Sequence, residues 1–135
     1  MRAKRILVSA AVGLCLWLSA CSFPTEEKKI RDVDYTVTSK EDLPEELWKQ
    51  IQESREEEFR LSYNDGEYLY IVRGYGIQPS TGYNITVEDL YLTEHSLVFD
   101  TKITGPAEGE EKSEKQTMPY IVVKTEAMDC QITYK

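Results

Sequence analysis

Residues 68–87 constrain the fold most strongly, because they join two strand-like runs through a connection with defined turn chemistry. The first run, residues 68–72, has the sequence YLYIV, an aromatic and β-branched composition that suits a pleated surface. Residues 78–81 (QPST) favour a type I turn, and Gly82 can then take a positive φ at no steric cost. Residues 83–87 alternate apolar with polar side chains, as a half-buried strand does. These features predict a long β-hairpin with a conformationally specified tip.

The rest of the chain predicts one small domain at residues 33–135. Leu43, Leu47, Ile51 and Phe59 fall near one helical face, so an amphipathic helix is expected from Pro44 onward. Glycine, proline and six charged residues predict an exposed, mobile loop at 105–116. Further strands are expected at 33–38, 97–103, 119–124 and 130–134. Glu88-Asp89 is expected to mark a bulge or kink, after which residues 90–92 continue the strand that begins at residue 83. The predicted fold class is α+β: an antiparallel β-sheet or small β-sandwich of five to six strands, with one amphipathic helix packed on it.

The amino terminus has the organisation of an export signal. A basic start precedes an apolar run at residues 6–18, which is too short to favour a permanent transmembrane helix. Residues 18–21 (LSAC) resemble the bacterial lipobox, in which the cysteine is lipidated and becomes the first mature residue. The sequence therefore predicts a signal peptide at residues 1–20, lipidation of Cys21 and a flexible tether at residues 21–32. The protein is expected at the cell membrane, lipid-anchored on its extracytoplasmic face; the alternative is an ordinary signal peptide with a chance cysteine.

The charge of the mature chain limits its partners. Residues 1–20 contain three of the 16 Lys+Arg and none of the 24 Asp+Glu, which leaves 13 against 24 and a net charge of −11. Such a chain is repelled by phosphates, so no nucleic-acid partner is expected. Anionic lipid headgroups repel it too, so the lipid anchor would have to hold it at the membrane.

Few side chains are suited to catalysis. Once Cys15 leaves with the signal and Cys21 carries the lipid, Cys130 remains alone, and one cysteine cannot form an internal disulfide. The single histidine, His95, falls in a predicted turn, and no serine lies in a G-x-S-x-G context. No spaced set of metal ligands is present. We therefore expect a protein that is not an enzyme and uses no metal or cofactor.

The predicted tip is the best candidate for partner binding. Tyrosine joins a large apolar face to a polar group, which suits a contact surface. The alternative is that residues 79–82 are only a well-formed turn. The candidate partner-binding residues are Tyr75, Pro79, Ser80, Thr81, Gly82 and Tyr83.

Two segments resemble the PrcB C-terminal family. Residues 76–85 (GIQPSTGYNI) are similar to its P-T-G-G-Y-type turn after a strand, and residues 116–123 (QTMPYIVV) to its T-x-P-Y strand. Residues 43–47 (LPEEL) and 70–72 (YIV) resemble lipoprotein versions of the family. Ser80-Thr81 stands where the family usually has Thr-Gly. The resemblance implies an all-β or α+β non-catalytic module, an accessory subunit that associates with a secreted, surface-located protease and stabilises it.

A second resemblance implies a different role. Residues 78–83 (QPSTGY) are similar to the N-P-T-T-G-Y loop of chagasin-type cysteine-protease inhibitors, which fold as Ig-like sandwiches. Those inhibitors also need a glycine-rich loop and an Arg-Pro-x-Trp loop. The only tryptophan after the signal is Trp48, in the predicted helix. Protease inhibition by the Pro79–Tyr83 loop is therefore the alternative function.

Overall fold

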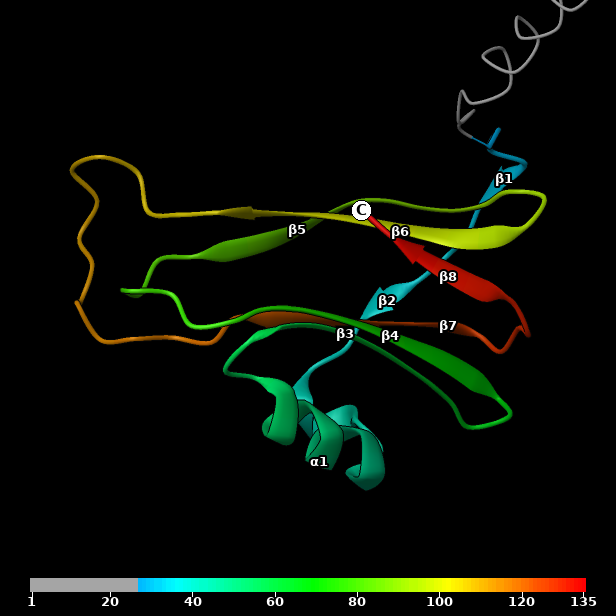
Figure 1. Cartoon of the computed structure of the whole chain (residues 1–135), viewed down its shortest axis with the longest axis horizontal. Coiled ribbons are helices and arrows are strands. Elements are labelled where there is room, and N and C mark those ends of the chain that lie inside the picture. Colours follow the sequence, from blue (N-terminus) through cyan, green and yellow to red (C-terminus); the bar gives the residue numbers. More distant parts are fainter. Residues whose placement is uncertain (1–26) are drawn as a thin grey trace, which may run out of the picture.

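A computed structural model describes residues 27–135. The predicted signal peptide and the predicted lipidation site, Cys21, lie outside the described residues. Two four-stranded sheets face each other, and one helix covers the outer face of the second sheet (Figure 1). The fold is therefore mostly β with one helix, and of the two arrangements expected it takes the sandwich.

The first sheet has the strand order β1-β5-β6-β8. All its pairs are antiparallel except β6 with β8, which is parallel. The pairing of β5 with β6 shifts register between Val87 and Asp89, where a bulge was expected from Glu88-Asp89. The bounds of these strands are Arg31–Asp32 (β1), Asn84–Leu92 (β5), Ser96–Thr104 (β6) and Gln131–Tyr134 (β8).

The second sheet is antiparallel throughout and has the order β2-β7-β4-β3. Strand β4 is buried along most of its length, because the other sheet covers one of its faces and the helix the other. The bounds are Thr36–Val37 (β2), Glu58–Asn64 (β3), Tyr68–Tyr75 (β4) and Tyr120–Glu126 (β7).

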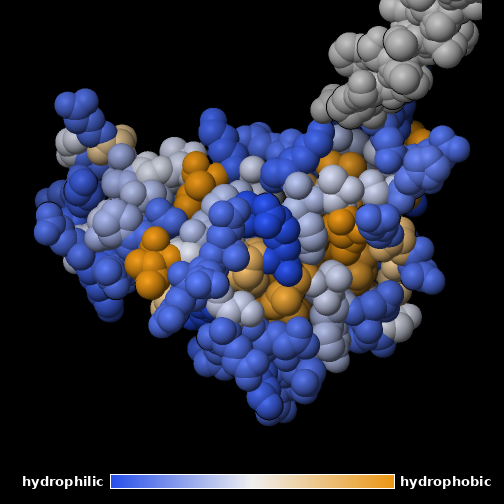
Figure 2. All heavy atoms as spheres, in the orientation of Figure 1, coloured by the Kyte–Doolittle hydropathy of each residue, from blue (hydrophilic) through white to orange (hydrophobic). Residues whose placement is uncertain are grey.

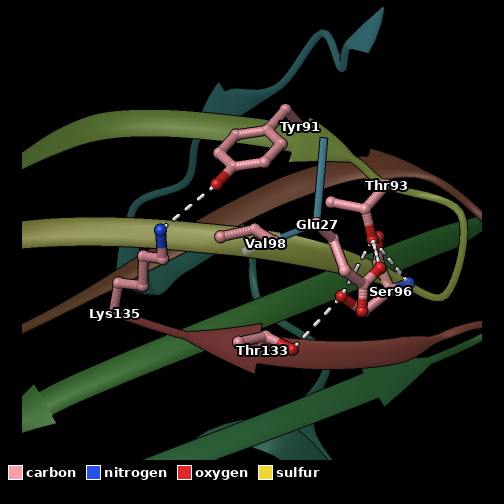
Figure 3. A pocket seen from close by; sticks show the side chains of 7 residues that line it. All are labelled: Glu27, Tyr91, Thr93, Ser96, Val98, Thr133 and Lys135. Atoms are coloured by element: carbon pink, nitrogen blue, oxygen red, sulfur yellow. Dashed lines mark hydrogen bonds between the residues drawn. The ribbon is translucent and has the colours of Figure 1, made fainter. Parts of the chain in front are cut away.

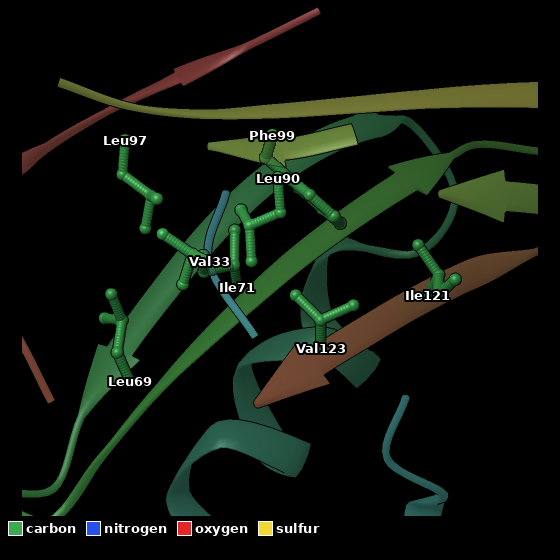
Figure 4. Close-up of a cluster of buried hydrophobic side chains, with 8 residues drawn as sticks. All are labelled: Val33, Leu69, Ile71, Leu90, Leu97, Phe99, Ile121 and Val123. Carbon is green, nitrogen blue, oxygen red and sulfur yellow. The ribbon is translucent and has the colours of Figure 1, made fainter. Parts of the chain in front are cut away.

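Two hydrophobic clusters hold the layers together. Between the sheets, Ile71 and Val123 pack against Leu97 and Phe99 from the opposite sheet (Figure 4). The second cluster lies under helix α1 (Glu45–Ser54), which follows the short 3-10 helix η2 (Lys40–Asp42). Its fully buried residues from the helix and the sheet are Leu47, Ile51, Val72 and Val122. The helix is thus fixed to the sheet by the apolar stripe that its sequence predicted.

The prediction of a hairpin over residues 68–87 was wrong. Strand β4 pairs with β3 and β7, whereas β5 pairs with β1 and β6 in the other sheet. The connecting residues 76–83 therefore cross from one sheet to the other. Local alternation identified both strands correctly, but alternation does not say which strands become neighbours.

Three further expectations need correction. The helix ends at Ser54 and does not include Phe59, which lies in β3, an edge strand that was not predicted. Of the expected first strand, residues 33–38, only Thr36–Val37 forms a strand, β2 in the second sheet, whereas β1 (Arg31–Asp32) precedes it and lies in the first sheet. With β1 and β3, the described residues contain eight strands. Within the expected tether, the N–H of Ile30 already donates to the carbonyl oxygen of Leu92 (2.7 Å), so the chain joins the sheet before residue 33.

Candidate functional site

The predicted binding residues lie at one end of the sandwich, here called the loop end. Two connections leave the sheets there: the crossover segment, residues 76–83 between β4 and β5, and the acidic loop, residues 105–119 between β6 and β7 (Figure 1). Each connection links the two sheets. The loop end is therefore built from two stretches that are distant in sequence and adjacent in space.

Main-chain hydrogen bonds join the two connections. Gln78 and Thr117 form an isolated antiparallel bridge, in which each N–H donates to the carbonyl oxygen of the other residue (2.8 and 3.1 Å). Next to it, the N–H of Tyr75 donates to the carbonyl oxygen of Pro119 (3.1 Å). The motif containing QPSTGY and the motif containing TMPY thus pair directly.

Side-chain hydroxyls add to this pairing. The hydroxyl of Thr117 donates to the carbonyl oxygen of Ser80 (2.8 Å), a residue only 5% exposed. The N–H of Thr81 donates to the carbonyl oxygen of Ser113 (3.0 Å), and the N–H of Ser113 donates to the hydroxyl oxygen of Thr81 (2.9 Å). The crossover segment is therefore held along its length against the acidic loop.

Close approaches at glycine complete the contact. Gly82 has φ +94°, as its position after the turn predicted, and a Cβ there would lie 2.9 Å from Cβ of Pro106. Gly105 lies under the ring of Tyr83, with only 3.0 Å from its virtual Cβ to Cε1 of that ring. Larger side chains at either glycine would separate the two connections.

The six predicted binding residues differ in how they are presented. Pro79 and Gly82 are exposed, Thr81 and Tyr83 are half-buried, and Ser80 is buried. Tyr75 ends β4 inside the sandwich and is also half-buried; its hydroxyl shares a hydrogen bond with the hydroxyl of Thr101 in β6 (2.5 Å). Only part of the predicted set is therefore offered to a partner.

Sequence reasoning missed Ile77, whose side chain is 46% exposed at the loop end. Its N–H donates to the carbonyl oxygen of Glu56 (3.1 Å), and Gly76 (φ +73°) lies against the backbone of residues 56–58. The sequence feature that could have indicated an exposed Ile77 is the position of this apolar residue between a glycine and a polar turn. The chain after helix α1 thus forms the third side of the loop end.

A buried cation lies beneath this surface. The guanidinium of Arg73, in β4, donates to the carboxylate of Glu58 and to the carbonyl oxygen of Gly74 (2.9 Å), and lies 4.4 Å from the ring centroid of Tyr75. The hydrogen bond from Arg73 lowers the pKa of the Glu58 carboxyl below its ordinary value. This cluster fixes the end of β4, from which the crossover segment leaves.

The surface of the loop end is mainly acidic. Its exposed acidic residues come from the acidic loop and from the chain after helix α1, and they outnumber the nearby lysines, Lys112 and Lys115. Hydrophilic residues dominate the face drawn in Figure 2, where apolar residues form separate patches. The acidic residues are Glu56, Glu57, Glu108, Glu110, Glu111 and Glu114.

A small hollow of about 180 Å³ lies on the outer face of the first sheet, toward the opposite end (Figure 3). Hydroxyls line it: those of Thr93 and Ser96 lie 3.3 Å apart, and the hydroxyl of Thr133 donates to that of Ser96 (3.2 Å). The carboxylate of Glu27 accepts a hydrogen bond from Thr93 (2.5 Å), which lowers the pKa of Glu27. Glu27 thereby fixes the start of the described chain to the turn between β5 and β6.

The remaining candidates for chemistry lie away from the loop end. His95 is exposed in the turn between β5 and β6, and Cys130 lies half-buried just before β8. Burial, and to a lesser extent the charge of Asp129, raises the pKa of the Cys130 thiol, the opposite of what a nucleophilic thiolate requires. Among residues 27–135, no group of histidine, cysteine and carboxylate side chains is placed to hold a metal ion.

The two paired connections lie inside a region with a known family pattern. Residues 69–126 match the PrcB C-terminal family. The match confirms the family resemblance seen in the two motifs. It runs from β4 to β7 and so includes both connections of the loop end, whereas helix α1 and β3 precede it and β8 follows it.

Other comparisons add no relative. No curated protein and no solved structure matches the chain. Within the described part of the chain, no helix is long and apolar enough to cross a membrane.

Proposed function

We propose that this protein is a lipid-anchored, extracytoplasmic binding module without catalytic activity, which stabilises a cell-surface protease complex through its loop end. The observation that carries the proposal is the pairing of Gln78 with Thr117, because it brings together the two motifs inside the PrcB C-terminal match. A surface held by main-chain bonds is preorganised, which lowers the ordering cost of binding.

The geometry of the sandwich supports an anchor at the end opposite to the binding surface. The described chain begins at Glu27, beside the turn after Leu92, whereas the loop end adjoins Asn84 at the other end of β5. Nine residues of strand separate these ends by roughly 30 Å, given about 3.3 Å per residue. A lipid on Cys21 would leave the loop end facing away from the membrane.

The anchor can be tested apart from binding. We expect the wild-type chain to fractionate with membranes and to incorporate labelled fatty acid, and Cys21→Ala to do neither. A Cys21→Ala variant that still fractionates with membranes and takes up the label would contradict the lipid anchor.

Partner binding is tested by crosslinking in intact cells, followed by identification of the captured protein. Gly82→Ala should reduce capture, because the new methyl group meets Pro106 and separates the two connections. Gly66→Ala is a matched control: Gly66 has nearly the same φ (+93°) in the turn between β3 and β4, but no atom of residues 27–135 lies within 4 Å of its virtual Cβ. Equal capture by the two folded variants would refute the role of the loop end.

Inhibition of a protease is the competing function for the same surface, and the exposed Pro79 is the feature that favours it. Titration of papain-like proteases with the purified protein separates the two. We expect no inhibition, and inhibition that Gly82→Ala abolishes would replace our proposal with the inhibitor.

A further inference from the structure

Strand β5 has an edge that no other strand of the described chain covers along most of its length. On that side, β1 pairs only with Tyr91 and Leu92. The N–H of Val33 donates to the carbonyl oxygen of Leu90 (3.0 Å), and the chain then leaves for the other sheet. Within residues 27–135, no strand lies beside β5 from Asn84 to Glu88. This stretch, the open edge, directly follows the crossover segment.

Hydrogen bonds on the far side of β6 show which groups of β5 face outward. The carbonyl oxygen of Phe99 and the N–H of Thr101 both bond to the main chain of Lys135 (2.9 and 3.3 Å), so both residues point away from β5. Their register partners on β5 are Leu90 and Val87. In an antiparallel pair, two directly opposite residues either exchange main-chain hydrogen bonds with each other or both direct their N–H and C=O groups away from the partner strand. Leu90 and Val87 therefore face away from β6.

Alternation extends this result along the open edge. Ile85 lies two residues before Val87 in regular pairing, so its N–H and C=O groups face the same way, whereas those of Thr86 face β6. The carbonyl oxygen of Leu90 is occupied by Val33, but no described residue occupies the edge-facing groups of Ile85 and Val87. Two donors and two acceptors are thus arranged for another strand.

The other long edge strand is less available. In β3, the carbonyl oxygen of Leu61 accepts a hydrogen bond from the hydroxyl of Tyr134 (2.8 Å), which reaches it from the opposite sheet. Strand β2 has only two residues. Within the described part of the chain, no side chain bonds to the main chain of the open edge of β5 in this way, and this edge directly adjoins the crossover segment.

Side chains around the open edge indicate the chemistry of a strand that would pair there. Ile85 and Val87 face inward and pack against the core between the sheets, whereas Thr86 and Glu88 are exposed on the outer face. Near the start of the strand, the carboxylate of Glu110 lies 3.6 Å from the virtual Cβ of Gly82. A partner strand would meet apolar surface on one side. On the other it would meet the carboxylates of Glu88 and Glu110, together with one cation, Lys102, the exposed register partner of Thr86 on β6.

We propose that the open edge of β5 binds an extended segment of a partner protein as an added strand, with apolar side chains on its inner face and basic ones on its outer face. Addition of a strand to a free sheet edge takes affinity from main-chain bonds and specificity from alternate side chains. The inference rests on the proposed function and specifies how the loop end holds its partner. The net negative charge of the chain disfavours a second copy as the occupant.

Amide exchange followed by NMR on the full chain in detergent micelles tests the open edge directly. The probe is a short peptide of alternating lysine and valine, and its control replaces lysine with glutamate. The basic peptide should slow exchange at the N–H groups of Ile85 and Val87 by about tenfold or more, and leave Thr86 unchanged. No protection, equal protection by the acidic peptide, or protection without peptide that rises with protein concentration would overturn the proposal.

The same edge can be tested in cells without confusing it with the proposed function. Ile85→Pro removes one edge-facing donor, and proline is tolerated where a strand N–H faces outward. Thr86→Val, which changes only an outward side chain, is its control. Capture that depends on Gly82 but not on Ile85 refutes the added strand and leaves the proposed function intact. Protection by the basic peptide with no protein captured in cells refutes the proposed function and leaves the added strand intact.

Discussion

Replacing Thr117 with valine tests whether the two connections of the loop end act as one unit. Valine keeps the β-branched shape but removes the hydroxyl that donates to the carbonyl oxygen of Ser80 (2.8 Å). Ser80 is 5% exposed, so water cannot fully replace the lost donor. An unsatisfied buried acceptor costs about 1–3 kcal/mol. The bridge between the main chains of Gln78 and Thr117 remains, so we expect the lower half of that range.

A loss of about 1.4 kcal/mol is a tenfold change in an opening equilibrium. We therefore expect the amide of Thr81, which donates to the carbonyl oxygen of Ser113 (3.0 Å), to exchange about tenfold faster in Thr117→Val if the connections open together. NMR-detected exchange measures this, and urea unfolding measures the global cost.

Thr117→Ser is the matched control, because serine keeps the hydroxyl and loses only a methyl group. Its exchange at Thr81 should remain near that of the wild type. If Thr117→Val and Thr117→Ser exchange at the same rate, the hydroxyl does not hold the connections together and the loop end is not a cooperative unit.

Three further predictions concern the parts that support this end. The ring of Phe59 lies where a Cβ of Gly74 would be, so Gly74→Ala should lower the free energy of unfolding by about 1–3 kcal/mol. In a double-mutant cycle followed by urea unfolding, adding Phe59→Ala should relieve part of that loss, and additive losses would contradict the contact. Leu47→Ala, which removes a fully buried helix side chain, should cost about 2–5 kcal/mol in the same assay, and a cost near zero would mean that the helix is not packed as described. Arg73 lowers the pKa of Glu58, so the stabilisation from their pair is complete above the ordinary carboxyl pKa and is lost as the pH falls through the lowered pKa. The difference in unfolding free energy between wild type and Glu58→Gln should therefore vanish in acid. A difference that persists in acid would contradict the pairing.

Local features of the fold were predictable because they depend on neighbouring residues. Gly82 has the positive φ expected after the turn. Asn64-Asp65-Gly66 consists of turn-favouring residues and forms a turn, in which the carboxylate of Asp65 accepts hydrogen bonds from two following N–H groups. Residues 58–63 alternate polar with apolar side chains as strictly as any strand here, but Phe59 also continued the helical stripe and was assigned to the helix. Two periodicities overlap at Phe59, and the local sequence does not decide which of them the fold follows.

The candidate site was predictable only in part, for a related reason. Composition identified the crossover segment, but the burial of Ser80 and the position of Tyr75 between the sheets depend on partners 26 or more residues away. Ile77 is exposed because Gly76 places the chain against residues 56–58, a contact that no local pattern encodes. Side-chain accessibility at this end is therefore a property of tertiary structure.

The mistaken hairpin bears on function as well as on topology. In a hairpin, residues 78–81 would contact only their own strands, and the acidic loop would be free to lie elsewhere. In the sandwich, the crossover segment leaves the second sheet and the acidic loop leaves the first sheet at the same end of the molecule. The two connections run in opposite directions between the sheets and therefore lie beside each other. The pairing of Gln78 with Thr117 follows from that route. A partner at this end therefore meets both motifs at once, and a change in the acidic loop should alter binding as strongly as a change at Pro79 or Gly82.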